Sequence, residues 1–509
     1  MGQSVGLQVD PGRDEPIYRQ IFDQVVRRIQ SRAFPPGYKL PPSRTLAREL
    51  AAHRNTVARA YADLEAAGFV SSTVGRGTFV TVPPASATPK APAPEPHRGT
   101  VPWAQLLSRA ARTESLSRAE RYARRPETRD VINLARMQPS EDLLPSELIA
   151  RCIDRVMSEH GARALTYAPP EGVHRLRDEI AKDLADRGVP ANADDILITS
   201  GSQQALDLLA RALVNPGDTI LVDETTYSGA IDLFSLAGAR LVSVPSDAQG
   251  PDLAALARFA RPDVKALYLM PNGHNPTGLF VSAERRRALV AWSQSSGIPI
   301  IEDDYAAGLV LDDTDAAPYL RALDGDVIHL SSFSKRLIPA LRVGFIVCPQ
   351  ALRGTLGSLK RVMDLGASAI LQHALAEFME RGYLRAHMHR LLPEYRLRRD
   401  TLEQALTAAL PSTMRFRRPS HGVVIWLPLP TGMDPDALYD EALRQGVLLL
   451  PNAMWSVDGR AQPGVRLTFC AETAPRLAEG ARRLGKAIKI LSGLRPKKGR
   501  AESPVIEAV

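Results

Sequence analysis

The stretch Ser331-Ser332-Phe333-Ser334-Lys335 follows an apolar run, and Arg342 lies seven residues further along the chain. Upstream, the run Ile300-Ile301-Glu302-Asp303-Asp304-Tyr305 places carboxylates at the end of another apolar segment. Desolvation and nearby cations lower the pKa of a lysine and make its amine nucleophilic. A nucleophilic lysine, a carboxylate for a ring nitrogen and a cation for a phosphate are the parts of a pyridoxal 5'-phosphate pocket.

Taken singly, these residues leave other interpretations open. Gly201-Ser202-Gln203 opens a predicted helix whose N–H groups favour a phosphate, but many strand–helix turns begin in this way. An aspartate at a strand end is more often a cap or a salt-bridge partner. Ser332–Lys335 also matches the Ser-x-x-Lys pattern of penicillin-binding enzymes, although no Ser-Asp-Asn or Lys-Thr-Gly accompanies it.

From about residue 131, apolar segments alternate with amphipathic helical patterns. The segments expected to be strands are Ile196–Thr199, Thr219–Val222, Ala266–Met270, Ile298–Glu302, Val327–Leu330 and Gly344–Val347. This alternation predicts an α/β fold, a mostly parallel sheet flanked by helices. A smaller C-terminal α+β lobe is expected from Val423–Leu427 onward, ending in a helix around Arg476–Leu491.

The first 82 residues carry a different pattern. The apolar residues Ile17, Ile21, Val25 and Ile29 recur every fourth position, as on the buried face of a helix. A second helix is expected after Ser43 as its N-cap, and a third from about Arg54. Two strands, Phe69–Val74 and Thr78–Val82, are expected around a glycine-rich tip. This order of elements predicts a winged helix-turn-helix.

The exposed face of the third helix suits the major groove of double-stranded DNA, where arginine and asparagine can read base edges. The residues expected to read it are Arg54, Asn55, Thr56 and Arg59. Arg44, at the start of the second helix, is expected to meet phosphates, and Arg76 at the hairpin tip an adjacent groove. A small helical bundle with exposed arginines is the plainer alternative.

The net charge of +8 is concentrated near the N-terminus. Residues 1–82 hold 11 Lys/Arg against 7 Asp/Glu, residues 83–130 hold 9 against 5, and the remainder is balanced at 44 each. Binding to a polyanion is therefore expected in the first quarter of the chain. A solvated basic face is the commoner reason for such an excess.

Composition also divides the chain into parts. Six prolines fall within residues 83–97 and predict an extended, semi-rigid segment, which an Arg-rich segment follows. The expected parts are a DNA-binding domain (1–82), a Pro/Ala- and Arg-rich linker (83–130), a cofactor-binding domain (131–495) and a basic tail (496–509).

Three widely spaced cysteines, Cys152, Cys348 and Cys470, argue against a disulfide framework or a zinc cluster and suit a reducing cytoplasm. The chain does not open on a signal peptide, and no apolar run is long enough to span a bilayer. We therefore expect a cytoplasmic protein without a metal site or a membrane partner.

The N-terminal sequence resembles the GntR-type DNA-binding domain. The resemblance rests on three runs, Pro35–Arg44, Arg54-Asn55-Thr56-Val57 and Gly75–Val80, and covers nearly all of residues 15–82. The order and spacing of the motifs over residues 131–490 resemble those of fold-type I aminotransferases.

The second resemblance implies roles for single residues. It implies Lys335 as the Schiff-base lysine and Asp303 as the partner of the ring nitrogen. It implies Asn275 and Tyr305 at the ring oxygen, with Tyr227 stacking on the ring. The residues implied at the phosphate are Ser202, Gln203, Ser332 and Arg342.

Two further residues concern the substrate site and the subunit contact. Arg466 matches the arginine that grips a substrate carboxylate, and here it would grip the carboxylate of an effector. Tyr167 matches a tyrosine that reaches the cofactor of the other subunit, which implies a homodimer.

A GntR-type domain joined by a linker to an aminotransferase-like domain resembles the MocR subfamily of bacterial transcription regulators. This resemblance implies a bacterial regulator that binds a DNA operator and is associated with the nucleoid when it is bound there. The large domain would sense pyridoxal 5'-phosphate or a small amino-compound effector through Schiff-base exchange at Lys335, and so alter operator binding.

The alternative is a working aminotransferase that also binds DNA, and the sequence leaves it open. Gly273–Gly278 is closer to catalytic members than to the His-Gln-aromatic-Pro pattern common among the regulators. Ala306-Ala307-Gly308 replaces the acidic stretch that often follows the tyrosine in regulators. By contrast, Asn133–Pro145 lacks the Gly-x-Pro usual near the substrate site. A cofactor-free scaffold is disfavoured because every expected cofactor contact is present.

Overall fold

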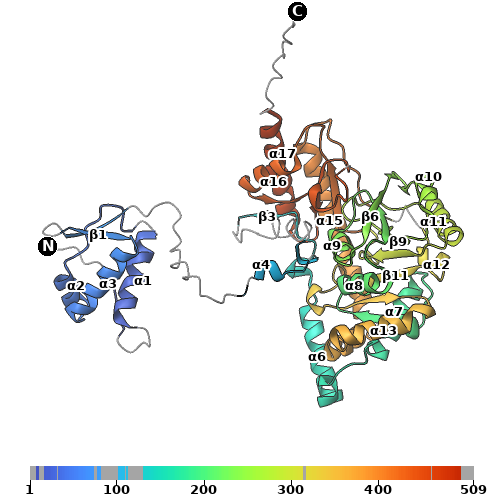
Figure 1. The fold of residues 1–509 in the computed structure, drawn as a ribbon, viewed down its shortest axis with the longest axis horizontal. Helices are drawn as coiled ribbons and strands as arrows, with labels where there is room; N and C mark the ends of the chain where they lie inside the picture. Colours follow the sequence, from blue (N-terminus) through green and yellow to red (C-terminus); the bar gives the residue numbers. More distant parts are fainter. Residues whose placement is uncertain are drawn as a thin grey trace, which may run out of the picture. The chain divides into compact units, whose positions relative to one another are not determined.

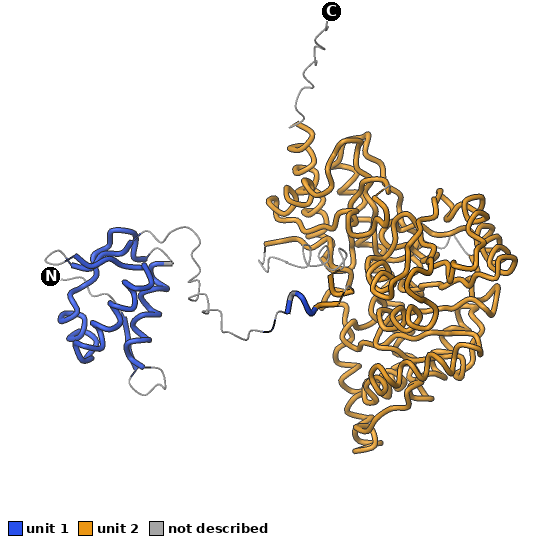
Figure 2. Tube along the Cα trace, viewed as in Figure 1, with its two compact units in different colours: residues 1–106 blue, residues 107–509 orange. Residues whose placement is uncertain are grey.

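The computed structural model describes residues 7–10, 16–30, 33–73, 77–81, 101, 103–108, 110–112, 130–312, 317–459 and 461–493. The chain divides into two compact units, residues 1–106 and residues 107–509, which Figure 2 distinguishes by colour. Each unit has a hydrophobic core of its own.

The first unit is a winged helix-turn-helix, as predicted (Figure 1). Its elements are α1 (Ile17–Gln30), α2 (Ser43–Glu49), α3 (Arg54–Ala66), β1 (Val70–Thr73), β2 (Gly77–Val80) and the short α4 (Trp103–Leu106). Strands β1 and β2 pair antiparallel as the wing. Ile21 and Val25 of α1 pack with Val57 and Leu64 of α3, and all four are fully buried. The expected repeat of apolar residues is therefore the face that builds this core.

The second unit is built on a seven-stranded sheet. In chain order its strands are β4 (Ile196–Thr199), β5 (Thr219–Asp223), β6 (Arg240–Val244), β9 (Val264–Leu269), β10 (Ile300–Asp304), β11 (Ile328–Ser332) and β12 (Gly344–Val347). Their order across the sheet is β4-β12-β11-β10-β9-β5-β6. Strand β12 runs antiparallel to both neighbours, and the other neighbouring pairs are parallel. The prediction of a mostly parallel sheet is confirmed.

Helices cover both faces of this sheet because successive strand residues point to opposite sides. Ile220 and Val222 of β5 pack in the core that α8 enters, whereas Leu221 packs in the core that α11 enters. The helices around the sheet are α6 (Ser146–His160), α7 (His174–Asp186), α8 (Ser202–Leu213), α9 (Ser228–Leu236), α10 (Leu253–Leu256), α11 (Ala283–Ser296), α12 (Leu320–Leu323), α13 (Gln350–Asp364) and α14 (Ala369–Glu380). A small hairpin, β7 (Ser246–Asp247) and β8 (Gly250–Pro251), adjoins it.

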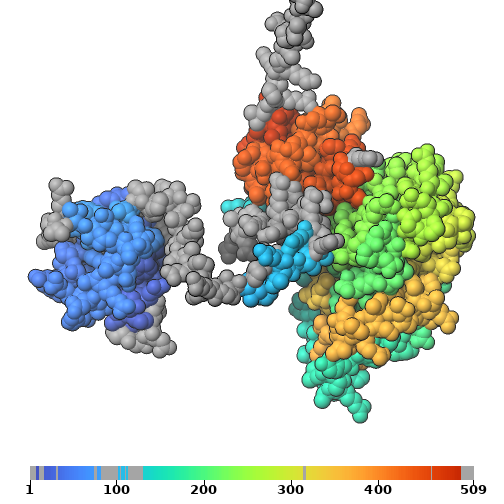
Figure 3. All heavy atoms as spheres, viewed as in Figure 1, coloured from blue at the N-terminus to red at the C-terminus, as the bar shows by residue number. Residues whose placement is uncertain are grey.

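A smaller α+β lobe follows, as predicted. It contains α15 (Tyr383–Ala409), β13 (Val424–Pro428), α16 (Pro435–Arg444), β14 (Val447–Leu448), β15 (Leu450–Pro451), β16 (Gly464–Thr468) and α17 (Ala474–Gly493). Strands β13, β16 and β15 form an antiparallel sheet, and α17 packs on α15. In Figure 3 the orange and red atoms of this lobe gather beside the green and yellow atoms of the sheet domain.

The start of the sheet domain is bound to this lobe. Strand β3 (Ile132–Asn133) pairs parallel with β14, and Leu134 N–H donates to the carbonyl of Leu448 at 2.8 Å. The segment 132–134, at the start of the second unit's described residues, is therefore attached to the small lobe. Within the described part of the chain, no helix combines the length and the apolar character needed to cross a membrane.

Candidate functional site

The pocket lies at the carboxyl ends of two neighbouring parallel strands, where open α/β sheets bind their ligands. Strand β10 contributes Asp303 near its end, and β11 ends at Ser332. The two strands are in register, with Asp303 opposite Leu330. Lys335 follows β11 by three residues, so the acid and the lysine reach the same edge of the sheet.

A cavity of about 110 Å³ lies at this edge. Its lining residues are Met137, Ser202, Gln203, Tyr227, Met270, Asn275, Asp303, Tyr305, Ser332, Ser334, Lys335 and Arg342. Nine of the ten predicted cofactor residues are among them. Sequence reasoning did not predict the lining residues Met137, Met270 and Ser334. Met270 directly follows β9, so its position at the carboxyl end of a strand could have indicated it.

Lys335 combines partial burial with a cationic surrounding. Burial, reinforced by the charges of Arg466 and Arg342, lowers the pKa of Lys335 to about 8. Its Nζ donates to the carbonyl of Met137 at 2.5 Å. A lysine with this pKa supplies a neutral, nucleophilic amine much more readily than an exposed one.

Asp303 is a buried carboxylate with one oxygen directed to a protein donor. The hydroxyl of Tyr268 donates to its Oδ2 at 2.7 Å. Oδ1 accepts no hydrogen bond from any residue that the structure describes. Burial raises the pKa of Asp303 to about 7, although the Tyr268 hydrogen bond opposes this shift. An unmatched buried oxygen of this kind suits a cationic donor such as a protonated ring nitrogen.

Two tyrosines frame the pocket. Tyr227 precedes α9, and its hydroxyl donates to Gln203 Oε1 at 2.9 Å. Burial raises the pKa of Tyr227 to about 12. The hydroxyl of Tyr305 donates to the carbonyl of Gly273 at 2.5 Å. Because a phenol has a single proton, Tyr305 would have to leave Gly273 before it could donate to a ligand.

The side of the cavity that is predicted to hold the phosphate is formed by the N-terminus of α8. Gly201 precedes the helix with a φ of 92°, and Ser202 is the first helical residue. Arg342 donates from Nη2 to the carbonyl of Ser200 at 2.8 Å. A Cβ at Gly201 would lie 3.0 Å from that same Nη2, so the guanidinium would have to shift by a few tenths of an ångström to make room for it. Helix N–H groups beside an arginine suit a dianionic phosphate.

Arg466 lies in β16 and is held beside the cavity. It donates from Nη1 to Asn275 Oδ1 at 3.0 Å and from Nη2 to the carbonyl of Ala135 at 2.7 Å. The first bond orients the Asn275 amide, so that its NH₂ group is directed away from Arg466. The guanidinium also lies over the ring of Trp455, 4.9 Å from its centroid. The predicted effector arginine and a predicted ring-oxygen contact therefore touch each other.

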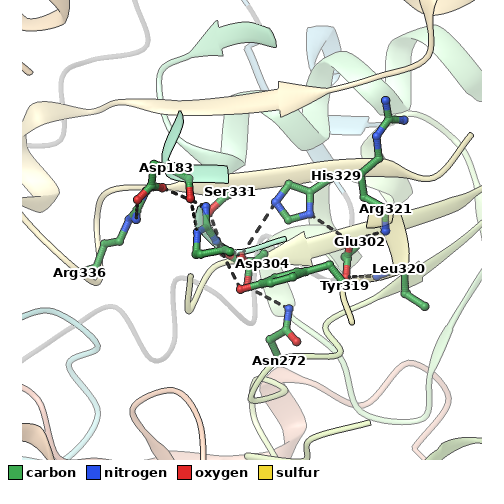
Figure 4. A network of polar contacts seen from close by, with 11 residues as sticks. Asp183, Asn272, Glu302, Asp304, Tyr319, Leu320, Arg321, His329, Ser331 and Arg336 are labelled. Carbon is green, nitrogen blue, oxygen red and sulfur yellow. Dashed lines mark hydrogen bonds and ion pairs between the residues drawn. The ribbon is translucent and has the colours of Figure 1, made fainter. Parts of the chain in front are cut away.

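Behind the pocket, Glu302 and Asp304, which flank Asp303 in β10, point to the opposite face of the strand and join a polar network (Figure 4). Glu302 accepts from the backbone N–H of Leu320 and Arg321, at 2.9 and 3.1 Å. His329 Nδ1 lies 3.0 Å from Glu302 Oε2. Asp304, next along the strand, accepts from Asn272 at 3.1 Å. These contacts fix the strand on which Asp303 stands.

The network continues to the residue beside Lys335. Arg187 pairs with Asp304 at 2.9 Å and with Asp183 at 3.1 Å, and Asp183 pairs with Arg336 at 2.9 Å. Burial alone would raise the pKa of Asp183, but Arg336 and Arg187 lower it to about 2. This row of charges anchors both the end of β10 and the segment that carries Lys335 (Figure 4).

Tyr167 stands apart from the cavity and is 82% exposed. Leu165, Val362 and Leu365 are also strongly exposed apolar residues. A Cβ at Gly366 would lie 3.0 Å from the carbonyl of Ala168, so the chain around Tyr167 adjoins the C-terminal end of α13. We call Leu165, Tyr167, Val362 and Leu365 the apolar patch.

In the first unit, four predicted DNA-reading residues lie on one element, since α3 begins at Arg54 and carries Asn55, Thr56 and Arg59. Thr56 is half-buried, and the other three are exposed. His53 caps the helix by accepting from Asn55 N–H at 3.2 Å. The guanidinium of Arg59 lies 3.9 Å from the centroid of the Tyr18 ring.

The two other residues predicted to contact DNA lie outside α3. Arg44 is exposed in α2, and Arg76 lies outside the described residues. Neither His53 nor Tyr18 was predicted from sequence.

Comparison with known proteins matches both units. The family described as aminotransferase class I and II covers residues 129–484, and the bacterial regulatory proteins of the gntR family cover residues 17–80. The HTH-type transcriptional regulator YdfD of Bacillus subtilis is 30% identical to this chain, and the alignment covers 94% of this chain and 97% of YdfD. The probable rhizopine catabolism regulatory protein MocR of Rhizobium meliloti is 28% identical to this chain, and the alignment covers 95% of this chain and 96% of MocR.

The chain belongs to the MocR subfamily of GntR-type regulators. The sensor-like part of this MocR-type regulator also resembles a solved aminotransferase. LysN, the α-aminoadipate aminotransferase of Thermus thermophilus, matches with a TM-score of 0.71 and 30% identity, over 78% of this chain and all of that one. LysN was solved with N-(5'-phosphopyridoxyl)-L-leucine. The predicted fold and cofactor class are thereby confirmed for the MocR-type regulator.

Proposed function

We propose that this regulator holds pyridoxal 5'-phosphate at Lys335 and that an amino compound entering the same pocket changes its binding to a DNA operator. The observation that carries this proposal is the convergence of nine predicted cofactor residues on one cavity, around a lysine whose pKa is lowered to about 8. The cavity occurs in a chain that also carries a GntR-type reader.

The residues present fit the cofactor. Bound pyridoxal 5'-phosphate supplies an aldehyde that condenses with amines and a ring that acts as an electron sink. Asp303 would hold the ring nitrogen through its unmatched Oδ1, and the Asn275 amide would hold the ring oxygen. The N-terminus of α8 and Arg342 would hold the phosphate, with Ser202, Gln203 and Ser332 beside them. Tyr227 would lie against the ring.

The effector in this proposal carries an amine and a carboxylate. Lys335 marks where the amine enters, and Arg466 offers a guanidinium beside it for the carboxylate. Asn275 and Trp455 hold Arg466 in that place. An effector changes operator binding only if it favours one arrangement of the regulator over another.

The reader and the dimer complete the proposal. Residues 1–82 would read the operator through α3, with Arg44 and Arg76 on the backbone and an adjacent groove. Residues 83–130 would link this reader to the sensor domain, residues 131–495. A second copy of the chain would cover the apolar patch, where Tyr167 lies, and would present two readers to two half-sites.

The first test concerns Lys335. The full-length protein is mixed with pyridoxal 5'-phosphate and reduced with borohydride, and its mass is measured both intact and after digestion into peptides. We expect the cofactor to be attached to the peptide that contains Lys335, and attachment to be lost in Lys335→Ala. Lys182→Ala, which removes an exposed lysine of α7, is the control and should keep the attachment. Attachment that persists in Lys335→Ala would contradict the assignment.

A second function, amino transfer, is favoured by the likeness to LysN. Steady turnover of an amino acid with a keto acid, without any change in DNA affinity, would support that function and contradict the sensor proposal. The same preparation serves for both measurements, so the two outcomes can be compared directly.

A further inference from the structure

A second cavity, which we call the cleft cavity, lies between the sheet domain and the small lobe. Its volume is about 590 Å³, within the roughly 300–1,000 Å³ of ordinary ligand pockets. The sheet domain lines it from the end of β5 and from the turn around His274, and the lobe lines it from residues 415–417 and from Trp426 of β13. None of the described residues lines both this cavity and the one at Lys335.

Hydrogen bonds between the sheet domain and the lobe hold the walls of the cleft cavity together. Arg417 Nη1 donates to the carbonyl of Ala248 at 3.1 Å. Thr226 N–H donates to the carbonyl of Trp455 at 2.9 Å. The cavity is therefore a preformed feature of the second unit, as most ligand pockets are.

Three carboxylates line the wall that the sheet domain supplies, and two of them have partners. Asp247 pairs with Arg285 at 2.8 Å, and Asp223 Oδ1 accepts from Ser246 Oγ at 2.8 Å. Glu224 is half-buried, and no described residue donates a hydrogen bond to it or pairs with it. Burial, together with the charges of nearby acids, raises the pKa of Glu224. A ligand cation at this wall would relieve the repulsion between these acids.

His274 leaves a second polar atom unmatched at the same wall. The residue is 4% exposed, and its Nδ1 lies 2.8 Å from Thr277 Oγ1. Its Nε2 lies 3.3 Å from Asp223 Oδ2, yet makes no hydrogen bond to a residue that the structure describes. A buried polar atom without a partner is uncommon in folded proteins. It indicates a polar group that the protein does not itself supply.

The wall that the lobe supplies carries a cation and aromatic rings. Arg415 is exposed, and none of the described carboxylates pairs with it. Trp426 is half-buried, and its ring lies nearly perpendicular to that of Trp455, with 6.2 Å between the centroids. Phe416 lines the same wall. An aromatic face attracts an organic ammonium group, and a guanidinium attracts a carboxylate.

We propose that the cleft cavity is a second ligand site, which takes a small zwitterion with one ammonium group and one carboxylate. Glu224 holds the ammonium group against the ring of Trp426, and Arg415 holds the carboxylate. Each wall offers one charge that no described residue neutralises, so a ligand with one charge of each sign matches both walls. The inference goes beyond the proposed function and does not depend on a cofactor at Lys335.

Titration calorimetry of the full-length protein tests this site. The probe is N,N,N-trimethyl-L-leucine, which keeps both charges of an amino acid but cannot condense with an aldehyde. It is titrated into protein saturated with N-(5'-phosphopyridoxyl)-L-leucine, which fills the cavity at Lys335 under the proposed function. We expect the probe to bind there with a dissociation constant of about 1 mM or lower, and with the same affinity when the protein is titrated alone.

Variants of the two unmatched charges locate the probe. Glu224→Gln and Arg415→Gln should each weaken its binding by at least about fivefold, because each removes a charge that pairs with the ligand. Glu147→Gln and Arg151→Gln, at exposed positions of α6, make the same changes elsewhere and should leave the affinity unchanged.

Three results would overturn the inference. The wild type does not bind the probe, either Glu224→Gln or Arg415→Gln binds it as well as the wild type does, or N-(5'-phosphopyridoxyl)-L-leucine abolishes its binding. The last result would place the probe in the cavity at Lys335. The proposed function has a separate outcome: it fails if N-(5'-phosphopyridoxyl)-L-leucine itself does not bind, and the probe titrated alone still tests the cleft cavity.

Discussion

Three consecutive acids, Glu302, Asp303 and Asp304, have different surroundings because they alternate across one strand. Glu302 and Asp304 point to the polar network, where Glu302 contacts backbone amides and His329, and Asp304 pairs with Arg187. Asp303 points to the pocket, where Tyr268 is its described donor. Because side chains alternate between the two faces of a strand, Asp303 is the one of the three acids that is available to a ligand.

The pH dependence of stability should report on Asp303. Its pKa is about 7 in the folded protein against 3.8 as the reference, so the folded state binds more protons between pH 4 and pH 7. Stability of the ligand-free protein should therefore fall as pH rises through this range, by at most about 1.4 kcal/mol per pH unit from this group. In Asp303→Asn, the thermal midpoint should change less between pH 5 and pH 8. Asp194→Asn, at an exposed position, should follow the wild type. Parallel profiles for all three proteins would contradict the buried acid.

Sequence reasoning found the polar residues of the pocket because their chemistry is specific. It did not find Met137, whose contribution is a backbone carbonyl that any residue could supply. It also could not show that Tyr305 donates to Gly273, since that contact joins two segments through the fold. Arg76 and its role remain a prediction, because Arg76 lies outside the described residues.

At the scale of elements, the turn between β4 and α8 shapes the side of the pocket that we propose holds the phosphate. Gly201 has a positive φ, and Gly344 of β12 lies so near that its Cβ would meet the backbone of Gly201 at 2.8 Å. Arg342 itself has a φ of 50°, a strained conformation that typically costs about 1–3 kcal/mol. Its hydrogen bond to Ser200 holds the side chain over the helix start.

Gly201→Ala should weaken the binding of pyridoxal 5'-phosphate by at least about tenfold, because the new methyl group displaces Arg342. Gly217→Ala is a matched control, since Gly217 has a φ of 97° but no atom lies within 4 Å of the place that a new methyl group would take. Both variants should lose similar stability from backbone strain. Calorimetric titration distinguishes them, and equal affinities would mean that Arg342 does not hold the phosphate.

Element boundaries were predicted less well than element types. The strand expected at Ile298–Glu302 is β10, Ile300–Asp304, because Gly297, Ile298 and Pro299 complete the turn after α11. Ser43 was expected to cap α2 but is its first helical residue, and Pro42 precedes it without a side-chain cap. Strand β6 was missed: it lies at the sheet edge, and its partly exposed residues give no continuous apolar run.

At the scale of the whole molecule, the uneven charge and the two family matches give the same division of labour. The reader carries exposed arginines on α3, and the sensor carries the buried pocket. Sequence could predict both halves because each has its own motifs. It could not predict that the carbonyls of Met137 and Ala135 accept hydrogen bonds from Lys335 and Arg466, because any residue type can supply a backbone carbonyl.

Arg59→Ala should weaken binding to operator DNA and reduce by about one the slope of log affinity against log salt concentration. Arg27→Ala is the control: it removes the same charge from an exposed position nine residues after Tyr18, on the opposite face of α1 from the ring that Arg59 contacts. Fluorescence anisotropy at several salt concentrations measures both slopes. An unchanged slope for Arg59→Ala would place that residue away from the DNA.

For the dimer proposed above, Val362→Glu should give a monomer in sedimentation experiments, because it buries a charge in the apolar patch when a second copy covers it. Leu397→Glu, at an exposed leucine of α15, makes the same kind of change elsewhere and should leave the dimer intact. A dimer that tolerates Val362→Glu would mean that the two copies meet through another surface.

The burial of Lys335 has a consequence for the reactivity of its amine. With a pKa of about 8, roughly one amine in ten is uncharged at pH 7, whereas at 10.5 the share is about one in three thousand. The uncharged share of this amine at pH 7 is thus some hundreds of times larger than that of a lysine with the ordinary pKa. The same packing that buries this side chain therefore keeps part of its amine ready to condense with an aldehyde at neutral pH.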